Sequence, residues 1–124
     1  ENSKDQWHSK QLIPIYKEGF VGEQGAGDIK LSADGKFIYA TNRGESNEIV
    51  VYAVGKQGLL TTVQIESVNG VSPRNVQLSP QGRWVLVSNQ ITGALSLFGR
   101  DVKTGKLTAM PVHIEIPSAV CTIF

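Results

Sequence analysis

The sequence lacks several features that would place it in a special class of protein. It has one cysteine, Cys121, among 124 residues, so no disulfide can form within the chain, and we expect the reducing environment of the cytoplasm. No apolar run approaches the about 20 residues that a membrane-spanning helix needs. The chain opens ENSKDQWHSK, without Met or an apolar signal core. No targeting segment is therefore visible, and export stays open because residues upstream of Glu1 can have been removed.

Charge and catalytic motifs are equally sparse. The 12 Lys and Arg residues against 11 Asp and Glu residues give a net charge of +1, and the basic residues do not cluster. This pattern argues against a nucleic-acid or membrane-surface partner. The sequence has no metal-ligand spacing, phosphate loop, nucleophile elbow or paired-carboxylate motif, so we expect no metal and no cofactor.

The informative feature is an internal repeat. The stretch SADGKFIYATNRG (32–44) returns as SPQGRWVLVSNQ (79–90), and the preceding leucines, Leu31 and Leu78, are 78 − 31 = 47 residues apart. A third, partial copy, SAVCTIF (118–124), resembles SPRNVQL (72–78) at an offset of 118 − 72 = 46. A period of this size is typical of a four-stranded β-propeller blade. The predicted fold class is therefore all-β.

Each full copy reads as four strands separated by turns. Asp34-Gly35, Gln81-Gly82 and Thr92-Gly93 are turn pairs, and β-branched and aromatic residues fill the segments between turns. The sequence predicts strands over 27–32, 37–42, 48–54, 59–68, 76–79, 83–89, 94–100 and 107–116. It also predicts an outer strand of a preceding blade in QLIPIYKEGF (11–20). The predicted organisation is thus the end of a blade in 1–24, blades in 25–70 and 71–117, and a closing innermost strand in 118–124.

Two full repeats cannot close a propeller, which needs about 4–8 blades. An open array leaves blade faces and strand edges unpaired. We therefore expect this chain to be part of a larger propeller, completed by an upstream segment or by other chains, and we expect the isolated chain to be inactive.

Four stretches resemble one family in their order along the chain: GDIKLSADGKFIYATNRG, GVSPRNVQLSPQGRWVLVSNQ, DVKTGKLT and PSAVCTIF. They are similar to the C-terminal third of the seven-bladed propeller lactonases, which include bacterial 6-phosphogluconolactonases and a fungal carboxymuconate-lactonizing enzyme. The resemblance covers 19–124. It implies a hydrolase of carbohydrate metabolism that acts on an anionic lactone. It also implies that 118–124 is the innermost strand of a blade whose other strands come from the N-terminus.

Strand direction places one candidate site. In a blade whose strands alternate in direction, the start of the first strand and the end of the second lie on the same rim of the central channel. Four pairs share that rim: Gly27-Asp28, Asn42-Arg43, Pro73-Arg74 and Asn89-Gln90. Arginine suits a phosphate or carboxylate because its planar fork donates two parallel hydrogen bonds. We predict Arg43 as the catalytic residue and predict substrate binding by Arg74, Asp28, Asn42 and Gln90.

The support for these residues differs. Arg43 is replaced by Gln90 in the second copy, so blade packing does not demand a cation there, and the resemblance places the family's channel arginine at Arg43. A loop-bracing ion pair is the competing interpretation for Arg74, and a turn-forming role competes for Asn42. The family's His and Glu partners have no matching motif in this chain, and neither His8 nor His113 fits.

Two other residues are interpreted as structural. Trp84 matches Phe37 in the repeat and is predicted to lie in the core between blades. Cys121 is predicted to be a buried small hydrophobic residue.

The functional hypothesis is a lactone hydrolase of the 6-phosphogluconolactonase type. The alternatives are a lactonizing isomerase of the same family and a non-catalytic propeller that binds a metabolite or protein on its rim, since fold does not fix function.

Overall fold

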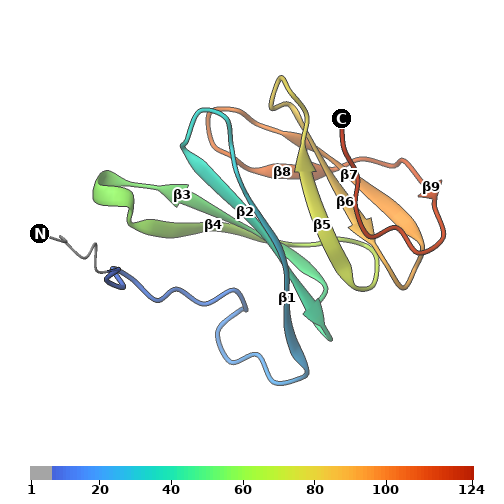
Figure 1. The fold of residues 1–124 in the computed structure, drawn as a ribbon, viewed down its shortest axis with the longest axis horizontal. Coiled ribbons are helices and arrows are strands. Elements are labelled where there is room, and N and C mark those ends of the chain that lie inside the picture. Colours follow the sequence, from blue (N-terminus) through green and yellow to red (C-terminus); the bar gives the residue numbers. More distant parts are fainter. Residues whose placement is uncertain (1–6) are drawn as a thin grey trace, which may run out of the picture.

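A computed structural model describes residues 7–124 and contains two antiparallel sheets (Figure 1). The first sheet has the order β1 (Gln24–Leu31), β2 (Phe37–Gly44), β3 (Glu48–Val54) and β4 (Leu60–Ser67). The second has the order β5 (Pro73–Leu78), β6 (Trp84–Asn89), β7 (Ala94–Arg100) and β8 (Leu107–Ala109), and β9 (Ile114–Glu115) also pairs with β7. Within 7–124 the only helical element is the 3₁₀ turn Lys56–Gly58. The all-β prediction of four-stranded antiparallel blades is confirmed.

The two repeats form the same turn between their first two strands. In the first copy, the Phe37 amide donates a hydrogen bond to the Ser32 hydroxyl at 3.0 Å, and the Gly35 amide donates to the Ser32 carbonyl at 2.8 Å. In the second copy, Ser79 receives the amides of Trp84 at 3.1 Å and Gly82 at 2.8 Å in the same way. Both glycines have positive φ, 70° and 66°, a conformation that is unfavourable for side chains with a Cβ.

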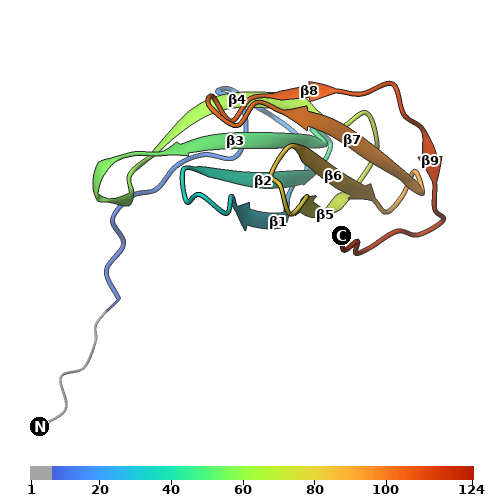
Figure 2. The same ribbon diagram turned by 90° about the horizontal axis from the view of Figure 1, so that it is seen from above.

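The sheets pack face to face through alternate residues of their strands. Figure 2 shows β1 and β5 on one side of the molecule and β4 and β8 on the other. One buried apolar cluster joins the facing surfaces and contains Phe37, Tyr39, Ile49, Val51, Val68, Val76, Val85, Val87, Phe98 and Leu107. Removal of this apolar surface from water is what holds the two sheets together.

The strand predicted over 11–20 is not formed, since the structure assigns no strand to 7–23. Pro14 lacks an amide hydrogen, and Gln11 meets β4 through its side chain, which bonds the Leu60 amide at 2.7 Å and carbonyl at 2.8 Å. Ile13 and Ile15 nevertheless pack on the face of the first sheet that is turned away from the second. Residues 1–6 of the predicted segment 1–24 lie outside the described residues.

The single strand predicted over 107–116 is divided into β8 and β9. The Met110 amide still donates to the Leu97 carbonyl at 2.9 Å. Pro111 has no amide to continue this ladder, so the chain leaves β7 and returns to it at Ile114.

Residues 118–124 have no strand assignment, in contrast to the predicted closing strand. A strand needs a neighbouring backbone, and this segment meets the second sheet mainly through side chains. The Thr122 amide donates to Asn75 Oδ1 at 2.9 Å, just as the Val76 amide donates to Asp28 Oδ2 at 3.2 Å. The chain returns toward β5 after β9 (Figure 2). Its ring-closing role stays a prediction, and the repeated contact supports it.

Two residues predicted to be buried are exposed in this chain. Trp84 is 42% exposed, because it alternates with Val85 and Val87 and so lies on the face of the second sheet that is turned away from the first. Cys121 is exposed, because no strand among residues 7–124 pairs with the segment that carries it. Both predictions concern a larger propeller with further blades, so the burial of these two residues stays a prediction.

At the end of the sheets away from Arg43, Arg100 joins the two repeats. Its guanidinium lies 5.5 Å from the ring centroids of both Phe37 and Tyr39. Its Nε donates to Tyr39 Oη at 2.5 Å and its Nη1 to the Gly82 carbonyl at 2.8 Å. Asp34 Oδ2 lies 4.0 Å from Nη2. A cation that is 3% exposed in its side chain is thus balanced by two aromatic faces, two acceptors and one acid.

The two sheets lie close together at Gly27, where there is no room for a side chain. A Cβ at Gly27 would lie 2.3 Å from the Pro73 carbonyl oxygen and 2.3 Å from Thr41 Oγ1. We expect Gly27→Ala to lower the free energy of unfolding of the full-length protein by about 1–3 kcal/mol, as for an overpacked core. Gly25→Ala is the matched control, because its Cβ would come no closer than 3.6 Å to another heavy atom. Equal denaturation midpoints for the two variants would contradict this reading.

Asp34 predicts a pH dependence of stability. The Ser32 hydroxyl, the Lys36 amide and the charge of Arg100 hold the pKa of Asp34 below its ordinary value of 3.8. A lowered folded-state pKa gives stability that is complete above the unfolded-state pKa and is lost as pH falls through the folded-state pKa. We therefore expect the full-length protein to lose stability below about pH 4, and we expect Asp34→Asn to lose less. Chemical denaturation between pH 2 and 7 measures both, and parallel curves would count against the effect.

Candidate functional site

Arg43 lies at the end of β2 and reaches across the first strand of its sheet. It pairs with Gly25 in the register of β1 and β2. Its Nε donates to the Ala26 carbonyl at 2.9 Å, so the side chain lies over β1, the innermost strand. Within residues 7–124, Nη1 and Nη2 have no protein partner, and this leaves the two outer nitrogens of the fork available to an anion.

A hollow of about 270 Å³ adjoins this arginine. Its walls come from the start of β1, the end of β2, the β4–β5 connection and the β6–β7 turn. The lining residues are Glu23, Gln24, Gly25, Arg43, Gly44, Val71, Ser72 and Ile91. The loops are joined to each other, because the Ile91 amide donates to the Val71 carbonyl at 3.1 Å. Arg43 is the one cation and Glu23 the one acid in this lining, and Val71 and Ile91 add two apolar side chains.

Arg74 and Gln90 form a pair beside this hollow. Arg74 Nη1 donates to Gln90 Oε1 at 3.2 Å, and the Gln90 amide donates to the Ser72 carbonyl at 3.0 Å. The loop-bracing ion pair considered for Arg74 is not found among residues 7–124, where its partner is this neutral amide. Arg74 is exposed. Its charge lies beside the hollow, but its side chain is not part of the lining.

The carboxylate of Asp28, on β1, accepts hydrogen bonds from β5 of the second sheet. Its Oδ2 accepts from Asn75 Nδ2 at 2.9 Å and from the Val76 amide at 3.2 Å, and lies 3.5 Å from Lys30 Nζ. Its Oδ1 accepts from the Ile29 amide at 2.8 Å. With these partners the side chain is 22% exposed. Its predicted contact with a substrate stays a prediction, and the contacts observed are structural.

Asn42 is fully buried and organises the turn from β2 to β3. Its Oδ1 accepts from the Glu48 amide at 2.8 Å and from Ser46 Oγ at 2.5 Å, and its Nδ2 donates to the Ile15 carbonyl at 2.8 Å. These contacts favour the turn-forming interpretation, and the contact of Asn42 with a substrate stays a prediction.

Sequence reasoning missed two residues near the hollow. Ser72 has a positive φ of 63°, and Ser118, at the matching position of the partial copy, has one of 56°. The shared serine in SPRNVQL and SAVCTIF was the available signal. Tyr16, from the upstream segment, bonds Gly25 through its hydroxyl. No repeat or motif marks this tyrosine.

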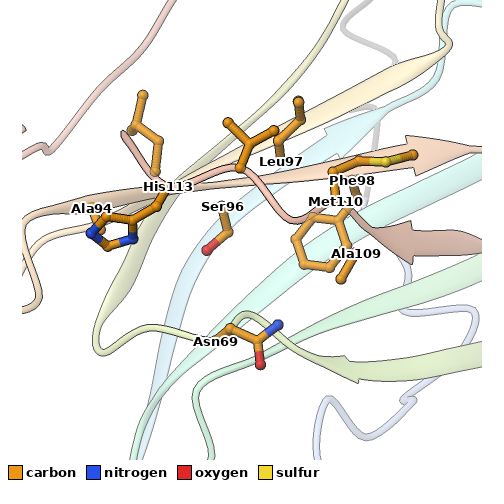
Figure 3. Close-up of a pocket in the computed structure, with 10 residues that line it drawn as sticks. Asn69, Ala94, Ser96, Leu97, Phe98, Ala109, Met110 and His113 are labelled. Atoms are coloured by element: carbon orange, nitrogen blue, oxygen red, sulfur yellow. The ribbon is translucent and has the colours of Figure 1, made fainter. Parts of the chain in front are cut away.

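A second hollow, of about 110 Å³, lies at the outer edge of the second sheet (Figure 3). It opens where the chain leaves β7 between β8 and β9, and His113, Ser96 and Asn69 border it. The His113 side chain is 72% exposed, and its Nε2 lies 3.1 Å from Glu115 Oε1. The break in pairing accounts for this space, which lies away from Arg43.

Metal-binding clusters and membrane-spanning helices are both absent from the described part of the chain. Among residues 7–124, no group of three or more His, Cys, Asp or Glu side chains is placed to hold a metal ion. The same residues contain no helix with the length and apolar character to cross a membrane.

Comparisons with known proteins agree with the fold. The chain is 41% identical over 91 residues to a 6-phosphogluconolactonase of Formosa agariphila, which covers 72% of this chain and 26% of that protein. It is 34% identical over 115 residues to a 6-phosphogluconolactonase of Bacillus subtilis, which covers 92% and 33%. The chain therefore spans about a quarter to a third of these relatives.

Solved structures match as well. A Lactobacillus plantarum protein superposes with a TM-score of 0.84 at 37% identity, over 88% of this chain and 32% of its own. The periplasmic gluconolactonase of Pseudomonas aeruginosa gives 0.78 at 41% identity, over 86% and 29%. The family model described as "Lactonase, 7-bladed beta-propeller" matches residues 1–124. The resemblance read from the sequence is thus confirmed, and this chain belongs to the seven-bladed β-propeller lactonase family.

Proposed function

We propose that the protein containing this chain is a lactone hydrolase of the 6-phosphogluconolactonase type and that Arg43 binds its anionic substrate. The observation that carries the proposal is the position of Arg43, whose Nε is fixed on the Ala26 carbonyl at 2.9 Å beside the rim hollow. One nitrogen fixes the side chain on β1, and the other two are left to bind the ligand. The names of the relatives support a lactone substrate.

The reaction is the addition of water to the ester carbonyl, followed by opening of the ring to a hydroxy acid. Negative charge develops on the carbonyl oxygen as water adds, and a fixed guanidinium stabilises it without reorganising. The same fork can receive a phosphate or carboxylate in two parallel hydrogen bonds. Arg74, paired with Gln90, adds a second positive charge on this rim.

The proposal assigns proton transfer to the His and Glu that the family resemblance implies. His8 and His113 are not those groups, because both lie outside the hollow that Arg43 lines. Within this chain, Asp28 and Asn42 act on the site by holding β1 and β2 in place, and Arg43 acts on the substrate.

Replacement of Arg43 in the full-length protein tests this function. We expect Arg43→Ala to lower kcat/KM for 6-phosphogluconolactone by about 10²- to 10³-fold, as for loss of a group that stabilises an oxyanion. Arg43→Lys keeps the charge but loses the fork, so it should fall between Arg43→Ala and the wild type. Release of acid during hydrolysis gives the rate, and circular dichroism checks folding.

The matched control is Arg83→Ala, because Arg83 is exposed in the turn between β5 and β6, away from the rim. It should keep wild-type turnover. A folded Arg43→Ala variant with wild-type turnover would remove this residue from the mechanism. Full-length wild-type protein that turns over no lactone would favour the non-catalytic propeller, and one that only closes lactone rings would favour the isomerase.

A further inference from the structure

The position of Arg43 depends on a weakly held stretch of β1. The β1–β2 register is interrupted between Ala26 and Ile29, so the first three residues of β1 are separated from the rest of the ladder. Gly25, which pairs with Arg43, is in this stretch, and glycine has the most backbone freedom of any residue. The Ala26 carbonyl that aims Arg43 is its neighbour. Something beyond the ladder has to fix this strand end if the arginine is to keep one position.

Tyr16 supplies that restraint through one hydroxyl group. The Gly25 amide donates to Tyr16 Oη at 2.5 Å, and Tyr16 Oη donates to the Gly25 carbonyl at 3.1 Å. The hydroxyl therefore occupies both backbone groups of the residue opposite Arg43. The tyrosine ring is itself held by stacking on Phe20, with centroids 4.8 Å apart and an interplanar angle of 13°.

The residues on either side of Tyr16 bind β2, the strand that carries Arg43, and its neighbour β3. The Ile15 carbonyl accepts from Asn42 Nδ2 at 2.8 Å, and Asn42 directly precedes Arg43. Lys17 Nζ lies 2.7 Å from Glu48 Oε1, and Glu48 pairs with Asn42 across β2 and β3. Residues 15–17 thus contact the residue before Arg43 and, through Tyr16, the residue opposite it.

We propose that Tyr16 is a positioning residue for Arg43, and that residues 15–17 are a clasp which sets where the guanidinium leaves the strands. The effect of this clasp on catalysis rests on the proposed lactone hydrolysis. The clasp comes from a segment that precedes the first repeat in the sequence, so the geometry of the rim depends on chain outside the blade that carries the arginine.

The experiment uses the full-length protein and two tyrosine-to-phenylalanine variants. Tyr16→Phe keeps the ring and its stacking on Phe20 but removes the hydroxyl from Gly25. Tyr52→Phe is the matched control, because its hydroxyl also bonds the upstream segment, at the Pro14 carbonyl at 2.9 Å, but away from Arg43. We expect Tyr16→Phe to lower kcat/KM for 6-phosphogluconolactone by about 10- to 100-fold, as for a slightly misplaced catalytic group. Tyr52→Phe should leave it unchanged.

A double-mutant cycle separates positioning from general support of the fold. If Tyr16 acts through Arg43, the variant Tyr16→Phe/Arg43→Ala will be no slower than Arg43→Ala alone. If Tyr16→Phe lowers the rate by the same factor in both backgrounds, the tyrosine acts independently of Arg43 and the proposal fails. Equal losses in Tyr16→Phe and Tyr52→Phe would overturn it too.

A readout without catalysis keeps this proposal distinct from the proposed function. Hydrogen exchange of the Gly25 amide and of Arg43 Nε–H, followed by NMR, reports the clasp directly. Tyr16→Phe should speed exchange at both groups, and Tyr52→Phe should not. A protein that hydrolyses no lactone but shows this pattern would refute the lactonase and uphold the clasp. Unchanged exchange at Gly25 in Tyr16→Phe would refute the clasp whatever the activity.

Discussion

The contact on which the rest of the structure depends joins a side-chain oxygen of an innermost strand to a backbone amide of the segment one repeat further along the chain. Asp28 Oδ2 receives the Val76 amide, and Asn75 Oδ1 receives the Thr122 amide. The spacing repeats, because the acceptors are 75 − 28 = 47 residues apart and the donors 122 − 76 = 46. Asn75 also donates to Asp28 at 2.9 Å. These partly buried bonds set β1 beside β5, and so bring the β4–β5 and β6–β7 connections against the end of β2 that carries Arg43.

The two ends of the paired sheets are stabilised differently, and this difference leaves the site open. At the end away from Arg43, Arg100 is enclosed by Phe37 and Tyr39, and burial raises the pKa of the Tyr39 hydroxyl although Arg100 opposes that rise. The Arg100 guanidinium is therefore occupied by contacts within the fold and is not available to a ligand. At the other end, Arg43 has only its Nε bonded within residues 7–124. An arginine held at one nitrogen near a polar hollow keeps bonding capacity for a ligand, whereas one enclosed by aromatic rings does not.

The sequence was sufficient for the fold because its repeat carries the packing information twice. The Ser32 and Ser79 turns and the order of strands follow from residues that recur at one period. The predictions that failed concern segments without a neighbour to pair with. Pro111 ends a ladder that its flanking residues favour, and residues 11–20 and 118–124 have strand-like sequences but lie against side chains. A strand-like sequence favours an extended backbone that is able to pair. A strand forms only where a second backbone lies beside it to accept and donate the hydrogen bonds.

The candidate site was predictable only where it departs from the repeat. Arg43 stood out because the second copy has Gln90 at the same position, a difference that blade packing does not require. Asp28 and Asn42 also lie near the rim, but their side-chain oxygens accept hydrogen bonds from the Val76 and Glu48 amides. No pattern in the sequence shows which polar atoms are already bonded within the fold. Tyr16 has no counterpart in a repeat, since it acts on Gly25 from a segment outside both copies. The repeat therefore predicts which strand ends form the rim. Arg43 itself, and Tyr16, which holds the strand opposite it, come from positions that do not recur in the repeat.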